Sequence, residues 1–190
     1  YDKAKFEVNA HNWIDMSDED YGISLLNDCK YGHEVNEHKM ILTLLKAPIK
    51  PDPKSDRGDH YFTYSLYPHA ETWKKAKTLE RGLEINHPLV PVDIKADGEL
   101  GADKSFITLT SDSMTLEAVK KCEEEDAYII RMVEKKGKSV DASVKFFAPL
   151  TYAAECDLIE RNDVPVEFDG DTISFHATPF EIKNYKVKIK

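Results

Sequence analysis

The sequence predicts an all-β chain, built as antiparallel β-sandwiches with one short helix. Apolar and polar residues alternate with a period of two in many short runs, the pattern of half-buried strands. These runs recur about every ten residues between turn-forming residues, as in small antiparallel sandwiches. No long helices alternate with the strands, so a parallel α/β fold is not expected.

The first half of the chain contains three clear strand patterns. Residues Tyr21–Asn27 form one, and Met40–Leu45 form the next, which stops at Ala47-Pro48 because proline removes a donor from the strand ladder. Residues Tyr61–Tyr67 carry aromatic or β-branched groups on both faces. We therefore expect this third strand to be central in its sheet or covered on both sides.

One segment has helical rather than strand spacing. Between Glu71 and Leu83 the apolar residues recur every three or four positions, which predicts one short helix. Thr72 is the expected cap, and Gly82 and Pro88 mark the expected exit.

A polar segment, Asp93–Lys104, follows the helix and is the predicted joint between two parts of the chain. It contains two glycines and shows no periodicity. Strand patterns resume after it, at Phe106–Thr110, Met114–Val119, Ala127–Val133, Ser143–Phe147, Tyr152–Cys156, Thr172–His176 and Glu181–Ile189.

Composition excludes several classes of function. The net charge is −9, and the lysines are interleaved with acids, so neither nucleic acid nor an anionic membrane is an expected partner. No apolar run approaches the roughly 18–20 residues that a membrane span needs. The surface is of the soluble, cytoplasmic type. The three cysteines, Cys29, Cys122 and Cys156, are far apart and expected to be free.

No residue pattern identifies a catalytic or metal site. A glycosidase needs two facing carboxylates, and no spacing singles out a pair. The histidines lack the spacing of known metal sites. Asp52, Asp56 and Asp59 lie in a loop that could bind calcium, but their spacing does not match the regular calcium loop. From the residues alone we expect no catalytic residue, no metal ligand and no cofactor in this chain.

The segment Asn27–Gly32 has the most unusual composition. Asn27, Asp28, Lys30 and Tyr31 place an amide, a carboxylate, an ammonium and a phenol directly after an apolar strand. Such a set can hydrogen-bond sugar hydroxyls, and the phenol ring can stack on a sugar face. The same residues also suit an ordinary turn, in which Asn27 and Asp28 bond their own backbone.

Several motifs together resemble one enzyme family. They occur in order at His11–Ser17, Asp20–Gly32, Leu44–Pro48, Gly58–His69, Asn86–Leu89 and Pro179–Lys183. They resemble the C-terminal region of glycoside hydrolase family 38 α-mannosidases, in particular the cytosolic and bacterial branch. The likeness covers nearly the whole chain.

The resemblance implies that residues 1–97 are the end of a large β-sandwich domain and residues 103–190 a small terminal sandwich. It implies a separate N-terminal catalytic domain holding a nucleophilic aspartate and a divalent metal, usually zinc. The chain's partners would then be that domain and mannose-containing glycans, with a homo-oligomer also allowed. The Asn27–Gly32 loop and Lys46 are the residues expected at the rim of the substrate site. The alternative is a free-standing carbohydrate-binding or protein-interaction module.

Overall fold

The computed structural model describes residues 7–95, 98–100 and 103–190. Within these ranges every strand pairing is antiparallel and there is one α-helix, which confirms the all-β prediction. The chain divides into two compact units, residues 1–94 and 95–190, called unit 1 and unit 2 below. Of the predicted joint, residues 96–97 and 101–102 lie outside the described ranges.

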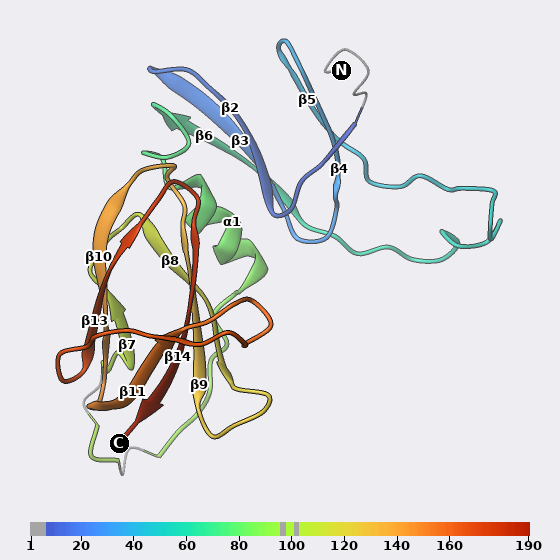
Figure 1. Ribbon diagram of the computed structural model, residues 1–190. Helices are drawn as coiled ribbons and strands as arrows, with labels where there is room; N and C mark the ends of the chain where they lie inside the picture. The colour runs from blue at the N-terminus through green and yellow to red at the C-terminus, as the bar shows by residue number, and fades with distance from the viewer. Residues whose placement is uncertain (1–6, 96–97, 101–102) are drawn as a thin grey trace. The chain divides into compact units, whose positions relative to one another are not determined.

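Unit 1 contains two three-stranded sheets. The larger has the order β2-β3-β6, with β2 at Trp13–Ser17, β3 at Tyr21–Asn27 and β6 at Tyr64–Ala70. The smaller has the order β1-β4-β5, with β1 at Val8–Asn9, β4 at Gly32–Asn36 and β5 at Lys39–Leu42. A long loop, residues 43–63, leaves β5 and returns to β6 without regular secondary structure (Figure 1).

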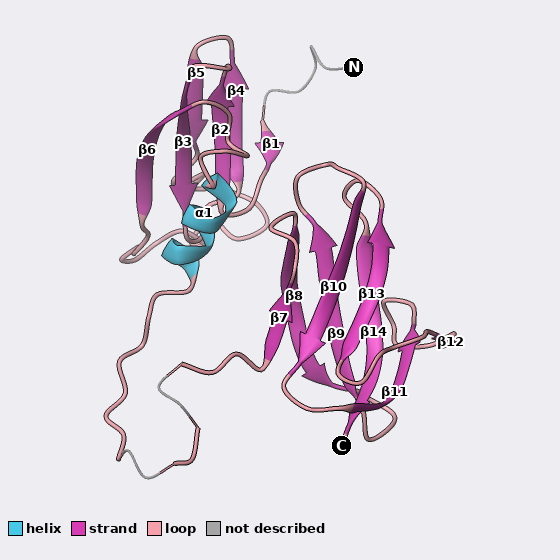
Figure 2. Ribbon diagram, turned by 90° about the vertical axis from the view of Figure 1, so that its left-hand side faces the viewer, coloured by secondary structure: helices cyan, strands magenta, loops and turns pink. Residues whose placement is uncertain are grey.

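The helix α1, Thr78–Asn86, packs on β2 and β3 (Figure 2). It begins later than the sequence predicted, because Lys77 has a left-handed φ of 57° and a separate turn precedes it. The carbonyl of Thr72, the expected cap, accepts backbone hydrogen bonds within that turn. Gly82, the expected exit, lies inside the helix. A Cβ there would lie 3.0 Å from the Trp13 ring, so glycine permits the close packing of helix on strand.

Strand β6 is at an edge of its sheet, which corrects the expectation of a central or doubly covered strand. Among the described residues it pairs only with β3. Tyr64 and Leu66 on its open face are 54% and 61% exposed. Pro68 lies within the strand, and proline is confined to edge positions because it cannot donate to a neighbouring strand. Aromatic residues on both faces were therefore a misleading signal for a central strand.

Unit 2 is a two-layer sandwich (Figure 2). One layer has the order β13-β10-β7, with β7 at Ile107–Leu109, β10 at Val140–Phe146 and β13 at Thr172–Ala177. The other has the order β12-β11-β14-β9-β8, with β8 at Met114–Lys121, β9 at Tyr128–Glu134, β11 at Leu150–Glu155, β12 at Val164–Pro165 and β14 at Ile182–Ile189.

Alternate residues of both layers fill the core of unit 2. On β9, Ile130 and Met132 point inward, and on β14 Tyr185 and Val187 do so. The opposing layer contributes buried residues of β10 and β13, namely Ala142, Val144, Phe146, Ile173 and Ala177. This is the period-two pattern that the sequence showed, because successive side chains of a strand point to opposite faces.

The three cysteines are free, as predicted.

Candidate functional site

Asn27, the last residue of β3, supports the loop that follows it. Both polar atoms of its side chain contact groups within the chain. Oδ1 accepts the Lys30 N–H at 2.8 Å, and Nδ2 lies 3.3 Å from Nε2 of His33. Nδ1 of His33 lies 3.1 Å from the Tyr31 carbonyl, so it carries the proton and Nε2 accepts from Asn27. Asn27 is only 1% exposed. Its predicted contact with substrate stays a prediction, and in this structure its side chain bonds within the chain.

Asp28 ties the loop to the chain just before β6. Its N–H donates to the Thr63 carbonyl at 3.2 Å, and its Oδ2 accepts the Thr63 N–H at 2.9 Å. Its Oδ1 is enclosed without a well-aligned donor in the described chain. Hydrogen bonding from the adjacent Cys29 thiol, followed by that from Thr63, lowers the pKa of Asp28. The same bond raises the pKa of Cys29. The lowered pKa favours the ionised form of Asp28, and its predicted contact with substrate stays a prediction.

The remaining predicted residues, Lys30, Tyr31 and Lys46, line one hollow of about 330 Å³ in unit 1. Its walls come from residues 29–32 and from the loop of residues 43–63. That loop contributes residues 43–46 and, further along, Asp56 and His60. We call this the loop hollow. Its size lies at the lower end of the range of ligand pockets, roughly 300–1,000 Å³.

The exposed groups around the loop hollow differ in how closely neighbouring side chains hold them. The Lys30 ammonium lies 4.7 Å from the centre of the Phe62 ring. The Tyr31 ring packs on the His11 ring with centroids 4.7 Å apart and is half-exposed. Lys46 is an exposed ammonium with a distant ion-pair partner.

The groups that line the loop hollow can bind hydroxyl groups. Ammonium and imidazole groups donate hydrogen bonds to sugar oxygens, and an aromatic ring can stack on a sugar face. Among the described residues Asp56 is the one carboxylate in the lining, whereas glycoside hydrolysis needs two that flank the scissile bond. The loop hollow therefore has the chemistry of a binding surface.

A second polar group in unit 1 contains serine, histidine and aspartate but is structural. Nε2 of His69 lies 2.7 Å from Oδ2 of Asp15, and the Ser24 hydroxyl donates to the same oxygen at 2.6 Å. A nucleophilic serine would instead bond to the histidine. Ser24 also lies 2.8 Å from the Thr78 hydroxyl of α1, and both residues are buried. The network fastens the helix to the sheet.

His69 in this network is held in its charged form. Nδ1 faces the Ala70 carbonyl at 3.2 Å and Nε2 faces the Asp15 carboxylate, so both ring nitrogens donate. Burial alone would lower the pKa of His69, but the bonds to Asp15 and to the Ala70 carbonyl raise it above the usual value. A buried ion pair of this kind destabilises the fold strongly when one partner is displaced.

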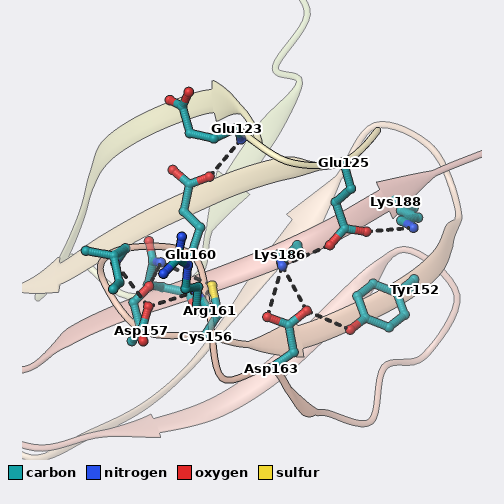
Figure 3. Close-up of polar contacts among 12 residues, drawn as sticks. Glu123, Glu125, Tyr152, Cys156, Asp157, Glu160, Arg161, Asp163, Lys186 and Lys188 are labelled. Atoms are coloured by element: carbon teal, nitrogen blue, oxygen red, sulfur yellow. Dashed lines mark hydrogen bonds and ion pairs between the residues drawn. The ribbon is translucent and has the colours of Figure 1, made fainter.

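A cluster of paired charges lies in unit 2, on the outer face of the five-stranded sheet (Figure 3). Lys186 on β14 is 5% exposed, and its Nζ lies 2.9 Å from Glu125 and 3.0 Å from Asp163. Burial opposes its charge, but these two carboxylates raise the pKa of Lys186. Lys188 also pairs with Glu125, at 2.9 Å.

The neighbouring carboxylate in Figure 3, Glu160, is likewise paired. It lies 2.7 Å from Lys120 and accepts the Glu123 N–H at 2.9 Å, and these contacts lower the pKa of Glu160 to about 2. Each of these charges thus has an internal partner. The cluster fastens the loop between β11 and β12 over the sheet, so we assign it a structural role.

The described residues contain neither a metal-ligand cluster nor a long apolar helix. No three His, Cys, Asp or Glu side chains of these residues come together in a way that could hold a metal ion. No helix among them is long and apolar enough to cross a membrane.

Sequence reasoning missed Asp56 and His60 as neighbours of Lys30 and Tyr31. Asp56 had been considered only as part of a calcium loop and as one of several unpaired carboxylates. The one available signal was loop length, because a long loop without secondary structure is often functional.

Two family descriptions match the sequence. "Glycosyl hydrolases family 38 C-terminal domain" matches residues 1–54, and "Glycosyl hydrolases family 38 C-terminal beta sandwich domain" matches residues 113–185. The second match lies within unit 2, the two-layer sandwich.

Relatives with the name alpha-mannosidase match across both units. Alpha-mannosidase 2C1 of Mus musculus is 32% identical over 189 residues, 97% of the chain and 18% of that protein. Its Homo sapiens counterpart is 36% identical over 166 residues, 86% of the chain and 16% of that protein. The chain thus spans less than a fifth of the length of these relatives.

A solved structure shares the fold. The crystal structure of a protein in the glycosyl hydrolase family 38 from Enterococcus faecalis matches 96% of the chain and 22% of its own, with a TM-score of 0.73. The two sequences are 16% identical, so this likeness concerns the fold alone.

Proposed function

We propose that this chain, which belongs to glycosyl hydrolase family 38, is the C-terminal, non-catalytic β-domain region of an α-mannosidase. The two C-terminal domain descriptions of that family together match well over half of the chain's residues. The whole enzyme would hydrolyse terminal α-D-mannose residues from mannosides or glycans. The observation that carries the proposal is the similarity to proteins named alpha-mannosidase over nearly the full chain. Matches to domains of a larger enzyme favour this function over a free-standing module.

We propose a scaffolding role for both units. Residues 1–97 would be the end of a large sandwich domain, and residues 103–190 a small terminal sandwich. The open edge of β6, with Tyr64 and Leu66 exposed beside it, offers unpaired backbone groups and apolar surface to the catalytic region. The same edge is open to a second copy in a homo-oligomer. We propose a cytoplasmic location for the enzyme.

We propose that the enzyme uses a divalent metal ion, zinc, and that this ion is bound by the catalytic region outside this chain. The described residues hold no cluster of ligands that fits it. What these residues supply is a binding surface. We assign Lys30, Tyr31 and Lys46 to the rim of the mannoside site, with Asn27 and Asp28 as supports of the loop that presents them.

We expect the isolated chain to leave an aryl α-mannoside intact. Among the described residues the loop hollow has one carboxylate and there is no metal cluster, so these residues do not supply the pair of carboxylates that hydrolysis needs. The measurement is release of nitrophenol from 4-nitrophenyl α-D-mannopyranoside. A longer form that includes the catalytic region should release it under the same conditions. Hydrolysis by the short chain that one substitution within it abolishes would refute the proposal.

Tyr31→Ala should lower kcat/KM of the longer form about tenfold, the effect of losing one contact worth about 1.4 kcal/mol. In the short chain the same substitution should barely change the melting temperature, because Tyr31 is half-exposed. Tyr21→Ala is the matched control, since Tyr21 is similarly exposed but does not line the loop hollow. If Tyr31→Ala instead unfolds the short chain and leaves the kinetics unchanged, the loop is structural.

A further inference from the structure

The loop of residues 43–63 supplies two walls of the loop hollow from positions that are ten or more residues apart. Residues 43–46 form one wall, and Asp56 and His60 belong to the other. The loop has no regular secondary structure to hold these walls together. Its first residue is held by a backbone bond, from the Thr43 N–H to the Gly32 carbonyl at 2.9 Å, and side-chain bonds add to this further along the loop. At its far end Thr63 is anchored by Asp28.

Asp56 makes a bond that joins the two walls and a second bond within its own wall. Its Oδ2 accepts the N–H of Ala47 at 2.7 Å, across nine residues of sequence. Its backbone carbonyl accepts from Nε2 of His60 at 2.9 Å. The side chain of Asp56 therefore reaches the wall of Lys46, while its backbone holds His60.

Ala47 needs this support because its backbone is strained. Its φ is +47°, in the left-handed region that costs a residue with a Cβ on the order of 1 kcal/mol. Lys46 precedes it directly, so a bond that holds the Ala47 N–H also restrains the backbone next to Lys46, which lines the hollow. The Lys46 ammonium itself is exposed, and its ion pair with Glu7 is long, at 3.8 Å.

We propose that Asp56 is a positioning residue for the mannoside site: by holding the Ala47 N–H it fixes the wall that carries Lys46. This inference rests on the proposed function of the loop hollow. Asp56 acts through Ala47, so its role depends on an acceptor oxygen at this position and does not need the negative charge.

Three variants of the chain test the role of Asp56. Asp56→Ala removes the acceptor, whereas Asp56→Asn keeps an amide oxygen that can accept the same N–H. Asp56→Ala with Ala47→Gly lets residue 47 adopt a positive φ without a steric cost. The probe is methyl α-D-mannopyranoside, titrated while the amide resonances of residues 29–32 and 43–46 are recorded.

We expect Asp56→Ala to weaken mannoside binding about fivefold, as for one net hydrogen bond, and Asp56→Asn to bind nearly as the unchanged chain does. The double variant should recover part of the loss. Hydrogen exchange at the Ala47 amide should speed up in Asp56→Ala and stay slow in Asp56→Asn. Melting temperatures should agree among the variants, because this loop is exposed.

Each contrary outcome has a separate meaning. Equal loss of binding in Asp56→Asn and Asp56→Ala would show that the carboxylate contacts the ligand, which overturns the positioning role. Unchanged exchange at the Ala47 amide in Asp56→Ala would overturn the inference whatever the mannoside does. Absence of any mannoside-dependent shift in the unchanged chain would refute the proposed function of the loop hollow. Hydrogen exchange at the Ala47 amide would still decide whether Asp56 holds the wall that carries Lys46.

Discussion

Gly22→Ala should destabilise unit 1 by about 3 kcal/mol or more, because an added Cβ has no space. It would lie 2.3 Å from Cε1 of His69 and 2.4 Å from Cβ of Ser17. Ser17 is fixed opposite Gly22 in the ladder of β2 and β3. His69 is bonded at both ring nitrogens, so moving it breaks the buried ion pair with Asp15.

The urea midpoint measured by tryptophan fluorescence checks this prediction. The chain has two tryptophans, Trp13 and Trp73, which lie in unit 1 with rings 5.1 Å apart, so the signal reports on unit 1. Gly98→Ala, in unit 2, is the control for an added Cβ that meets no atom within 4 Å, and it should leave the fluorescence midpoint of unit 1 unchanged within about 0.5 kcal/mol. Equal midpoints for Gly22→Ala and the unchanged chain would contradict the clash.

Strands with apolar residues on one face could be predicted from the sequence, and those held by polar partners could not. Tyr21–Asn27 was predicted with the bounds that the structure gives. The strand β4, Gly32–Asn36, was missed because its buried side chain is His33, whose partners are Asn27 and the Tyr31 carbonyl. No local pattern reveals such bonds, since strand formation depends on neighbours across the sheet.

The candidate site shows the same division. Composition alone drew attention to Asn27–Gly32, but it could not tell which half faces solvent. Asn27 is buried partly because the Asn86 side chain, 59 residues away, donates to its carbonyl at 3.0 Å. Asp56 and His60 reach the loop hollow through an irregular loop, and irregular loops have no periodicity that would place a side chain.

Strand β9 ends on a charged residue, Glu134, at a position that faces the core of unit 2. Glu134 is fully buried. Its carboxylate accepts four backbone N–H groups, from Lys136 at 2.8 Å, Gly137 at 2.7 Å, Lys138 at 3.1 Å and Phe180 at 3.0 Å. Burial alone would raise the pKa of Glu134, but these four bonds outweigh it and lower the pKa below the usual value.

Glu134→Gln should destabilise unit 2 by about 3 kcal/mol at neutral pH, because an amide has the size of the carboxylate but turns an N–H₂ toward backbone donors. The cost depends on pH with a definite sign. A carboxyl whose pKa is lower in the folded state stabilises the fold above its unfolded value of 4.5, and this contribution disappears as the pH falls through the folded pKa. The difference between the variant and the unchanged chain should therefore shrink in acid.

Far-UV circular dichroism during urea unfolding measures this loss for the strands of unit 2, while tryptophan fluorescence reports on unit 1 in the same sample. We expect Glu134→Gln to shift the circular dichroism transition of unit 2 and to leave the fluorescence midpoint unchanged. Glu117→Gln on the exposed face of β8 is the matched control and should shift neither. A cost of Glu134→Gln that stays constant from pH 7 down to pH 3 would mean that the carboxylate charge contributes nothing, and that shape alone selects glutamate at this position.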